Sequence, residues 1–237
     1  MSTPGTRPTI YSGPLSMFGA KVQIAALEKR LDFELVMVPY DSQQGYNPKH
    51  PEVLRINPKR QVPVLVHGDL ELFDSTQIFE YLEDLRPDPA LWPREIAARA
   101  RARGLEHQSD EVYFPHIIRL MSLQDALDGD PAVAAIEAAR NFYLDMERRL
   151  ASGDWLVGSY SFADIAFYMA ALFGERQGAT VTVSTPRLLA WRERMTRRAP
   201  VRTVVVAMAR WLKAAGRPVP AFMASADAES TGSPPIA

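Results

Sequence analysis

The sequence of 237 residues contains no cysteine at all. The chain therefore has no disulfide bonds, no cysteine nucleophile and no zinc site built from thiolates. Histidine is also scarce: the chain has His50, His67, His107 and His116. These four residues form neither an HExxH motif nor another paired spacing typical of metal ligands. We therefore expect no metal site.

Other familiar signals are missing as well. The sequence has neither GxGxxG nor GxxxxGK[ST], the glycine-rich fingerprints of nucleotide-binding loops. Lys and Arg number 27 against 28 Asp and Glu, and the basic residues are scattered, which argues against a nucleic-acid partner. No segment approaches the roughly 18 apolar residues of a membrane span, and the N-terminus has no apolar signal core. We expect a cytoplasmic protein that binds neither nucleic acid nor membrane.

The first half of the chain has the pattern of a small mixed sheet with helices. Four strands are predicted, at residues 9–12, 33–38, 62–66 and 70–73. A helix joins the first two strands, and a tight turn joins the last two. The helical crossover predicts a parallel pair, and the tight turn predicts an antiparallel pair. Three helices are predicted, beginning at Ser16, Pro51 and Ser75.

Two positions in this half offer groups to a ligand. Pro63 begins a strand although it cannot donate to the ladder, so the Val62–Pro63 bond is either a plain trans bond or a cis bond that exposes the backbone of Val62. Asp74 and Ser75 place a carboxylate, a hydroxyl and free N–H groups at a helix start. Together these positions suit a small peptide with a charged amino-acid head.

The second half has a helical pattern throughout. Three prolines between residues 86 and 93 mark a linker between two domains. A long helix from Arg94 to about Ala126 should be kinked or split at Pro115, and further helices follow. Ser161 and Asp164 form a capping box, which we interpret as structural. The segment after Gly216 is rich in Pro, Ala and Ser and is expected to be disordered.

Three ordered motifs between residues 9 and 85 resemble those of a known family. Residues 16–27, SMFGAKVQIAAL, resemble the S-P-F-x-x-R-V-x-I-A-L opening of serine-type glutathione transferases. Residues 57–65, NPKRQVPVL, resemble their N-P-x-x-K-V-P-x-L, and residues 74–82, DSTQIFEYL, their E-S-x-x-I-x-x-Y-L. Residues 49–51, KHP, are similar to K-S-P of the tau-type branch, and the chain looks like a bacterial member with tau- or theta-like N-terminal motifs. The resemblance implies a thioredoxin-like N-terminal domain with a cis proline at Pro63, followed by an all-helical C-terminal domain.

The resemblance also implies the chemistry of the site. Glutathione is γ-Glu-Cys-Gly, and its nucleophile is the thiolate, which a hydroxyl and a helix N-terminus stabilise. Ser16 would fill this catalytic role, with Ser12 and Tyr11 as competitors; as an ordinary N-cap it would also stabilise its helix. The implied glutathione-binding residues are Phe18, Lys49, Gln61, Val62, Pro63, Asp74 and Ser75. Met17, Phe18, Tyr113, Phe114 and His116 are candidates for the wall of the acceptor pocket, or for the core.

These observations lead to a prediction of function. We expect a glutathione-binding domain at residues 9–86, a helical domain at 94–216 and a disordered tail at 217–237. Glutathione is the implied co-substrate, without a metal, and a small hydrophobic electrophile is the implied partner in a detoxifying homodimer. The missing cysteines exclude the cysteine-type reductases. A specialised lyase, dehalogenase or aryl-ether-cleaving enzyme, and a binding protein without turnover, remain as alternatives.

Overall fold

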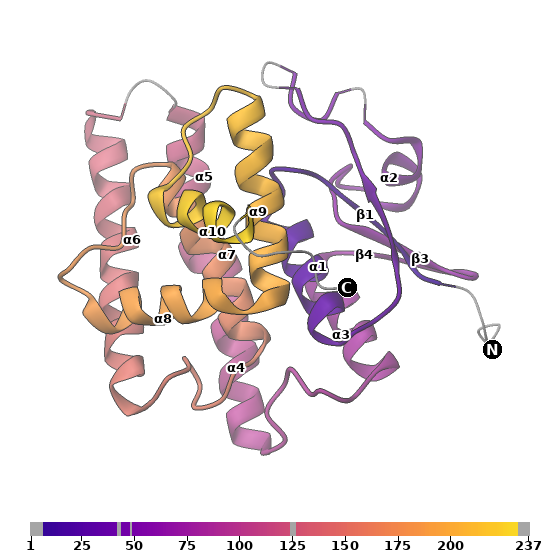
Figure 1. Cartoon of the computed structure of the whole chain (residues 1–237), viewed down its shortest axis with the longest axis horizontal. Coiled ribbons are helices and arrows are strands. Elements are labelled where there is room, and N and C mark those ends of the chain that lie inside the picture. The colour runs from indigo at the N-terminus through magenta and orange to yellow at the C-terminus, as the bar shows by residue number, and fades with distance from the viewer. Residues whose placement is uncertain (1–6, 42–43, 48, 124–126, 232–237) are drawn as a thin grey trace.

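The computed structural model describes residues 7–41, 44–47, 49–123 and 127–231. A four-stranded sheet with helices α1–α3 occupies one side of the molecule, and helices α4–α10 occupy the other (Figure 1). No helix within the described ranges is long and apolar enough to cross a membrane.

The sheet has the strand order β2-β1-β3-β4. Its strands are β1 Thr9–Ser12, β2 Glu34–Met37, β3 Val64–His67 and β4 Leu70–Phe73. β1 and β2 are parallel because α1 crosses over between them, whereas β3 is antiparallel to both β1 and β4. The mixed sheet predicted from the sequence is confirmed.

The entry into β3 differs from the prediction. The strand begins at Val64, not at Val62, because Pro63 has no N–H with which to join the ladder. The Val62–Pro63 peptide bond is cis, as the family resemblance implied. The structure records no hydrogen bond from the N–H or to the C=O of Val62 within the described residues, so both groups are available to a ligand.

Helix α1, Met17–Glu28, is buried on nearly all sides. One face, with Val22 and Ala26, packs on the core of the sheet. The other, with Ala20 and Ile24, belongs to the core of the C-terminal helices, so α1 lies between the two halves (Figure 1). A helix covered on both sides needs apolar or small residues around most of its circumference, as found here. This half is completed by α2 Pro51–Ile56 and α3 Ser75–Leu85.

The C-terminal half surrounds α7, Phe162–Arg176, whose residues 162–174 are all buried. The helices around it are α4 Ile96–Gln108, α5 Phe114–Leu123, α6 Asp130–Arg149, α8 Pro186–Arg197 and α9 Ala199–Ala214, with a 3₁₀ turn at Leu150–Ser152. The long helix predicted around Pro115 is split, as expected, by a π-helical turn at Ser109–Tyr113. Pro115 then stands at the second position of α5, directly after this π-helical turn.

The disordered tail expected after Gly216 is wrong for most of its length. Residues Ala221–Thr231 form helix α10, which lies across α7 and α9 in Figure 1. Met223 is fully buried, the Phe222 ring lies 4.6 Å from the Arg192 guanidinium, and Asp227 accepts a hydrogen bond from Arg210 at 2.7 Å. The local composition suggested disorder, but packing against α8 and α9 stabilises the helix. Residues 232–237 lie outside the described residues.

Asp164 fixes the start of α7 in the way the capping-box motif predicted. Its fully buried carboxylate accepts hydrogen bonds from the backbone N–H groups of Ser161 at 3.0 Å and Leu156 at 3.1 Å. It also accepts one from the Trp191 indole at 2.9 Å, which links α7 to α8. Burial raises the pKa of Asp164 to about 6, although these donors oppose the shift.

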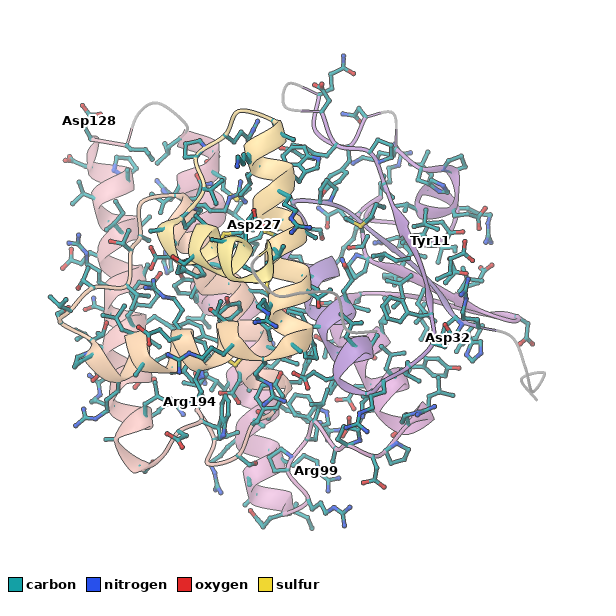
Figure 2. The ribbon with its side chains drawn as sticks, viewed as in Figure 1. Tyr11, Asp32, Arg99, Asp128, Arg194 and Asp227 are labelled. Atoms are coloured by element: carbon teal, nitrogen blue, oxygen red, sulfur yellow. The ribbon has the colours of Figure 1, made fainter. Side chains whose placement is uncertain are left out.

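We expect Asp164→Ala to lower the free energy of unfolding by about 3 kcal/mol or more, because it leaves buried donors without an acceptor. Urea denaturation at pH 7 measures this difference. Asp32→Ala is the control, since Asp32 is exposed and holds only a loose ion pair with Arg7 at 3.6 Å (Figure 2). A similarly small change in both variants would contradict the structural role of Asp164.

Candidate active site

Two cavities meet between the sheet and helices α4 and α5. The first, of about 300 Å³, is polar and is lined by Asp74, Ser75, Glu106 and Asp110, among others. The second, of about 350 Å³, is mainly apolar and is lined by Ser16, Val53, Phe114 and Phe173, among others. Three residues line both cavities and mark where they join: Phe18, Gln61 and Val62. A ligand with a polar head and a reactive end could therefore span the two.

Ser16 is the N-cap of α1 and lines the apolar cavity beside this junction. Its Oγ accepts a hydrogen bond from the N–H of Gly19 at 2.9 Å, which leaves the hydroxyl hydrogen free to donate to an anion. Gly19 is required here because a Cβ would lie 2.1 Å from the Oγ of Ser12. The positive end of the helix dipole adds to the stabilisation of negative charge at this point.

The two competitors of Ser16 are placed less favourably. Ser12 is fully buried, and its Oγ accepts a hydrogen bond from Gln23 at 2.7 Å. Tyr11 lies on β1 (Figure 2), with its ring centre 5.0 Å from that of His50. Burial raises the pKa of the Tyr11 phenol, which opposes ionisation. Neither residue is part of the lining of the two cavities.

The residues expected to hold the polar end of the ligand line the polar cavity. Asp74 is the N-cap of α3, and its Oδ1 accepts hydrogen bonds from Thr76 at 3.0 Å and Gln77 at 3.4 Å. Its φ of +76° lies in the left-handed region that residues other than glycine rarely adopt. Ser75 is buried at the first position of α3, and Pro63 also lines the polar cavity. Since the cap occupies Oδ1 of Asp74, its second carboxylate oxygen is the one left for a cation.

Of the two remaining candidates, Gln61 lines the polar cavity together with Asp74, and Lys49 does not. Lys49 lines the apolar cavity only, whereas Gln61 lies at the junction. Arg60, which the sequence interpretation did not include, also lines the apolar cavity and has a φ of +55°. Phe18 lines both cavities and packs edge-on against Phe114, with 5.4 Å between the ring centres.

The sequence interpretation also missed a buried charge cluster in the polar cavity. The ammonium of Lys21, fully buried on α1, lies 2.9 Å from Glu106 and 2.5 Å from Asp110. Glu106 also accepts a hydrogen bond from the Thr76 hydroxyl at 2.7 Å. The sequence signal for this cluster was the spacing of four residues between Glu106 and Asp110 on one predicted helix. The same spacing is also found on solvent-exposed helix faces.

Asp110 has an unused hydrogen-bonding site. Its Oδ1 is buried and has no partner, although its Oδ2 bonds Lys21. Burial raises the pKa of Asp110 to about 6, against the opposing effect of the Lys21 ammonium, and Glu106 adds to the increase. A buried carboxylate oxygen without a partner on a cavity wall is a ready acceptor for a ligand's ammonium group.

The wall of the apolar cavity agrees only in part with the candidates from the sequence. Phe114 lines it together with Ile118 and Met121, which follow on the same face of α5. Met17 also lines it, but His116 does not. Tyr113 is a core residue, because its fully buried hydroxyl bonds that of Tyr143 at 2.6 Å. The described residues contain no group of three His, Asp or Glu that could hold a metal ion.

Comparison with known proteins identifies the family. Residues 10–90 match the model of the glutathione S-transferase N-terminal domain, and residues 113–199 match that of the C-terminal domain. The chain therefore belongs to the glutathione S-transferase family, and the predicted fold class, a thioredoxin-like domain followed by a helical domain, is confirmed.

Individual relatives agree with this placement. The chain is 30% identical to glutathione S-transferase APIC of Nicotiana tabacum over 198 residues, which cover 77% of this chain and 89% of the tobacco protein. It is 31% identical over 131 residues to the stringent starvation protein A homolog of Coxiella burnetii, covering 54% of this chain and only 56% of that protein's length. The structure of glutathione transferase F7 from Populus trichocarpa is 26% identical, with a TM-score of 0.72 over 85% of this chain and 99% of the poplar chain.

We expect Lys21→Met to lower the free energy of unfolding by about 3–5 kcal/mol at pH 7, because it leaves two buried carboxylates without a cation. Burial raises the pKa of Asp110 to about 6, and without the opposing charge of Lys21 this pKa lies further above its value in the unfolded chain. The folded variant therefore binds more protons, and part of the lost stability returns as the pH falls towards 5. Urea denaturation at both pH values measures this effect.

Lys213→Met is the matched control, since Lys213 is exposed near the end of α9. An equal, small loss of stability in both variants, or a loss in Lys21→Met that does not change with pH, would contradict the buried ion pairs.

Proposed function

We propose that this protein is a glutathione transferase in which Ser16 stabilises the thiolate of glutathione for attack on a hydrophobic electrophile. The observation that carries the proposal is the position of Ser16. Its hydroxyl, which has a hydrogen free to donate, lies at the N-terminus of α1 on the wall of the apolar cavity, two residues before Phe18, which lines both cavities. The names of several relatives, which are glutathione S-transferases, support the same activity.

Glutathione would bind across the junction of the cavities. The α-carboxylate of its γ-glutamyl group suits the N-terminus of α3 at Ser75, and its ammonium suits Asp74 and Asp110. The cysteinyl backbone would pair with the free N–H and C=O of Val62, in the manner of an added strand. The glycyl carboxylate would then lie towards Gln61 and the cations of the apolar cavity, Lys49 and Arg60.

The reaction follows from this placement. The thiol gives its proton to solvent, and the hydrogen bond from Ser16 together with the α1 dipole favours the thiolate. A sulfur electron pair attacks an electrophilic carbon of the acceptor, so that a carbon–sulfur bond forms and the leaving group departs with the bonding pair. Phe114, Ile118 and Phe173 would hold the apolar body of the acceptor.

The proposed division of labour is a glutathione-binding domain at residues 9–86 and an acceptor-binding helical domain at 94–216. The homodimer, the cytoplasmic location and the detoxifying role remain predictions of the sequence. A specialised lyase or dehalogenase would use the same thiolate with another leaving group, and acceptor screening separates these activities. A binding protein without turnover is a further alternative, because the relative from Coxiella burnetii is not named as a transferase.

The central test is Ser16→Ala, followed by ultraviolet titration of the thiolate in the glutathione complex. In the unaltered protein we expect the bound thiol to ionise well below about 8.5, the ordinary pKa of a thiol. In the variant the thiol pKa should rise towards that value while glutathione still binds. We expect kcat/KM to fall roughly 10- to 150-fold, the equivalent of one hydrogen bond to a charged group.

Ser16→Thr and Tyr11→Phe are the companion variants. Ser16→Thr keeps both the cap and the hydroxyl, so it should retain most of the thiolate, and Tyr11→Phe should leave the titration unchanged. If glutathione does not bind the unaltered protein, the proposed transferase activity is wrong. If Ser16→Ala ionises glutathione normally, the enzyme stands but Ser16 is not its activating residue.

A second prediction concerns pH. Because Asp110 must lose its proton to accept the glutathione ammonium, glutathione should bind more tightly as the pH rises through about 6. Asp110→Asn should weaken binding about 10-fold or more at pH 7.5 and have a smaller effect at pH 5. Calorimetric titration at the two pH values measures both affinities.

Asp128→Asn is the control for this prediction, because Asp128 is exposed just before the start of α6 (Figure 2) and lines neither cavity. The same pH dependence in Asp110→Asn as in the unaltered protein would show that Asp110 does not hold the ammonium.

A further inference from the structure

The apolar cavity, which the acceptor would enter, has charged side chains of one sign on its wall. Among the described residues that line it, the charged side chains are the cations Lys49 and Arg60, and there is no Asp or Glu. The polar cavity is mainly acidic, with four carboxylates on its wall against the single ammonium of Lys59: Asp74, Glu106, Asp110 and Glu111. The acids suit an ammonium, whereas the acceptor would enter a cavity whose charged groups are all positive.

A third cation, Arg176, lies next to two residues that line this cavity, Phe173 and Tyr46, although it is not itself part of the lining. It is the last residue of α7, and its guanidinium carbon lies 4.8 Å from the centre of the Phe173 ring, which lines the cavity. Its other ionisable neighbours are Arg217 after α9 and the phenols of Tyr40 and Tyr46, of which Tyr46 also lines the cavity. Burial lowers the pKa of Arg176, and the positive charge of Arg217 lowers it further.

Arg176 lacks the partner that a half-buried cation usually has. The structure records no hydrogen bond and no ion pair for its guanidinium within the described residues. The adjacent carboxylate cannot serve, because Glu175 is bonded to Arg192 and to the N–H of Val181. The guanidinium nitrogens of Arg176 are also absent from the buried, unpartnered atoms of the described chain, so they retain access to solvent. A half-buried guanidinium without a protein partner favours the binding of an anionic group of a ligand.

We propose that Arg176 binds an anionic group of the acceptor, so that the preferred substrates are aromatic or alkyl electrophiles that carry a carboxylate. This inference rests on the proposed transferase function. Phe173 and Tyr46 would contact the apolar body of such an acceptor, the carboxylate would pair with Arg176, and the electrophilic carbon would face the sulfur beside Ser16. Lys49 and Arg60, which line the apolar cavity together with the junction residue Gln61, remain for the glycyl carboxylate of glutathione.

The geometry also explains why the carboxylate would matter for selectivity. A planar guanidinium can form two parallel hydrogen bonds to one carboxylate, and a partly desolvated site strengthens both. A neutral acceptor of the same shape would leave Arg176 without a partner, so the two acceptors should differ in affinity even though they fill the same apolar space.

The test compares two glutathione conjugates that differ in one charge. S-(4-carboxybenzyl)glutathione and its methyl ester occupy both cavities and need no turnover, so calorimetry reports binding alone. We expect the unaltered protein to bind the acid at least about 10-fold more tightly than the ester. Arg176→Met should remove this preference and leave the affinity for the ester unchanged, whereas Arg176→Lys should restore part of the preference. Arg101→Met, at an exposed position of α4, is the control and should behave like the unaltered protein.

The outcomes separate this inference from the proposed function. Equal binding of acid and ester by the unaltered protein overturns the role of Arg176 and leaves the transferase intact. So does an equal loss of both conjugates and of glutathione in Arg176→Met, which would mean that Arg176 only supports Phe173 or holds glutathione itself. If the unaltered protein binds neither conjugate nor glutathione, the proposed function fails, and this inference fails with it.

Discussion

The structure depends on the burial of α1 between its two halves. The helix presents one apolar face to the sheet and another to the C-terminal helices, so neither half has a complete core without it. Its charged residues are buried and are paired across the boundary: Lys21 with Glu106 and Asp110, and Glu28 with Arg198 at 2.8 Å. Buried charges are tolerated only when partners are in place. The same contacts fix the position of Ser16, at the start of α1, relative to the helical half.

A similar network holds the connection between the halves. The ammonium of Lys29, directly after α1, contacts Glu83 at 2.5 Å and the carbonyl groups of Arg86 and Pro89 at 2.7 and 3.0 Å. Glu83 in turn accepts hydrogen bonds from the backbone of Leu91 and Trp92. The proline-rich linker is thereby attached to α1 and α3. A site built from both halves requires this rigidity, because its two cavities have walls from each.

The two cavities differ in the charge of the residues that line them, and this difference would orient a bound ligand. Acidic groups gather in the polar cavity around the start of α3, whereas the apolar cavity has the cations Lys49 and Arg60 and the hydroxyl of Ser16 on its wall. An ammonium is favoured at one end and negative charge at the other, with the developing thiolate between them. This arrangement orients a peptide with charged ends before its thiolate attacks the acceptor.

Local sequence patterns determined a large part of this protein. The strands, the helix start at Ser16 and the cap at Asp74 were predictable, because each depends on residues within one turn or one strand of its neighbours. The local pattern left the Val62–Pro63 bond open between cis and trans, and only the family resemblance implied the cis form. Tertiary structure alone decided the rest. Asp110 received its role from Lys21, which is 89 residues away in the chain; Tyr113 became a core residue through Tyr143; and α10 is a helix because α8 and α9 cover it. Long-range burial decides which polar groups lose water and which face a cavity, and a local pattern contains no information about that environment.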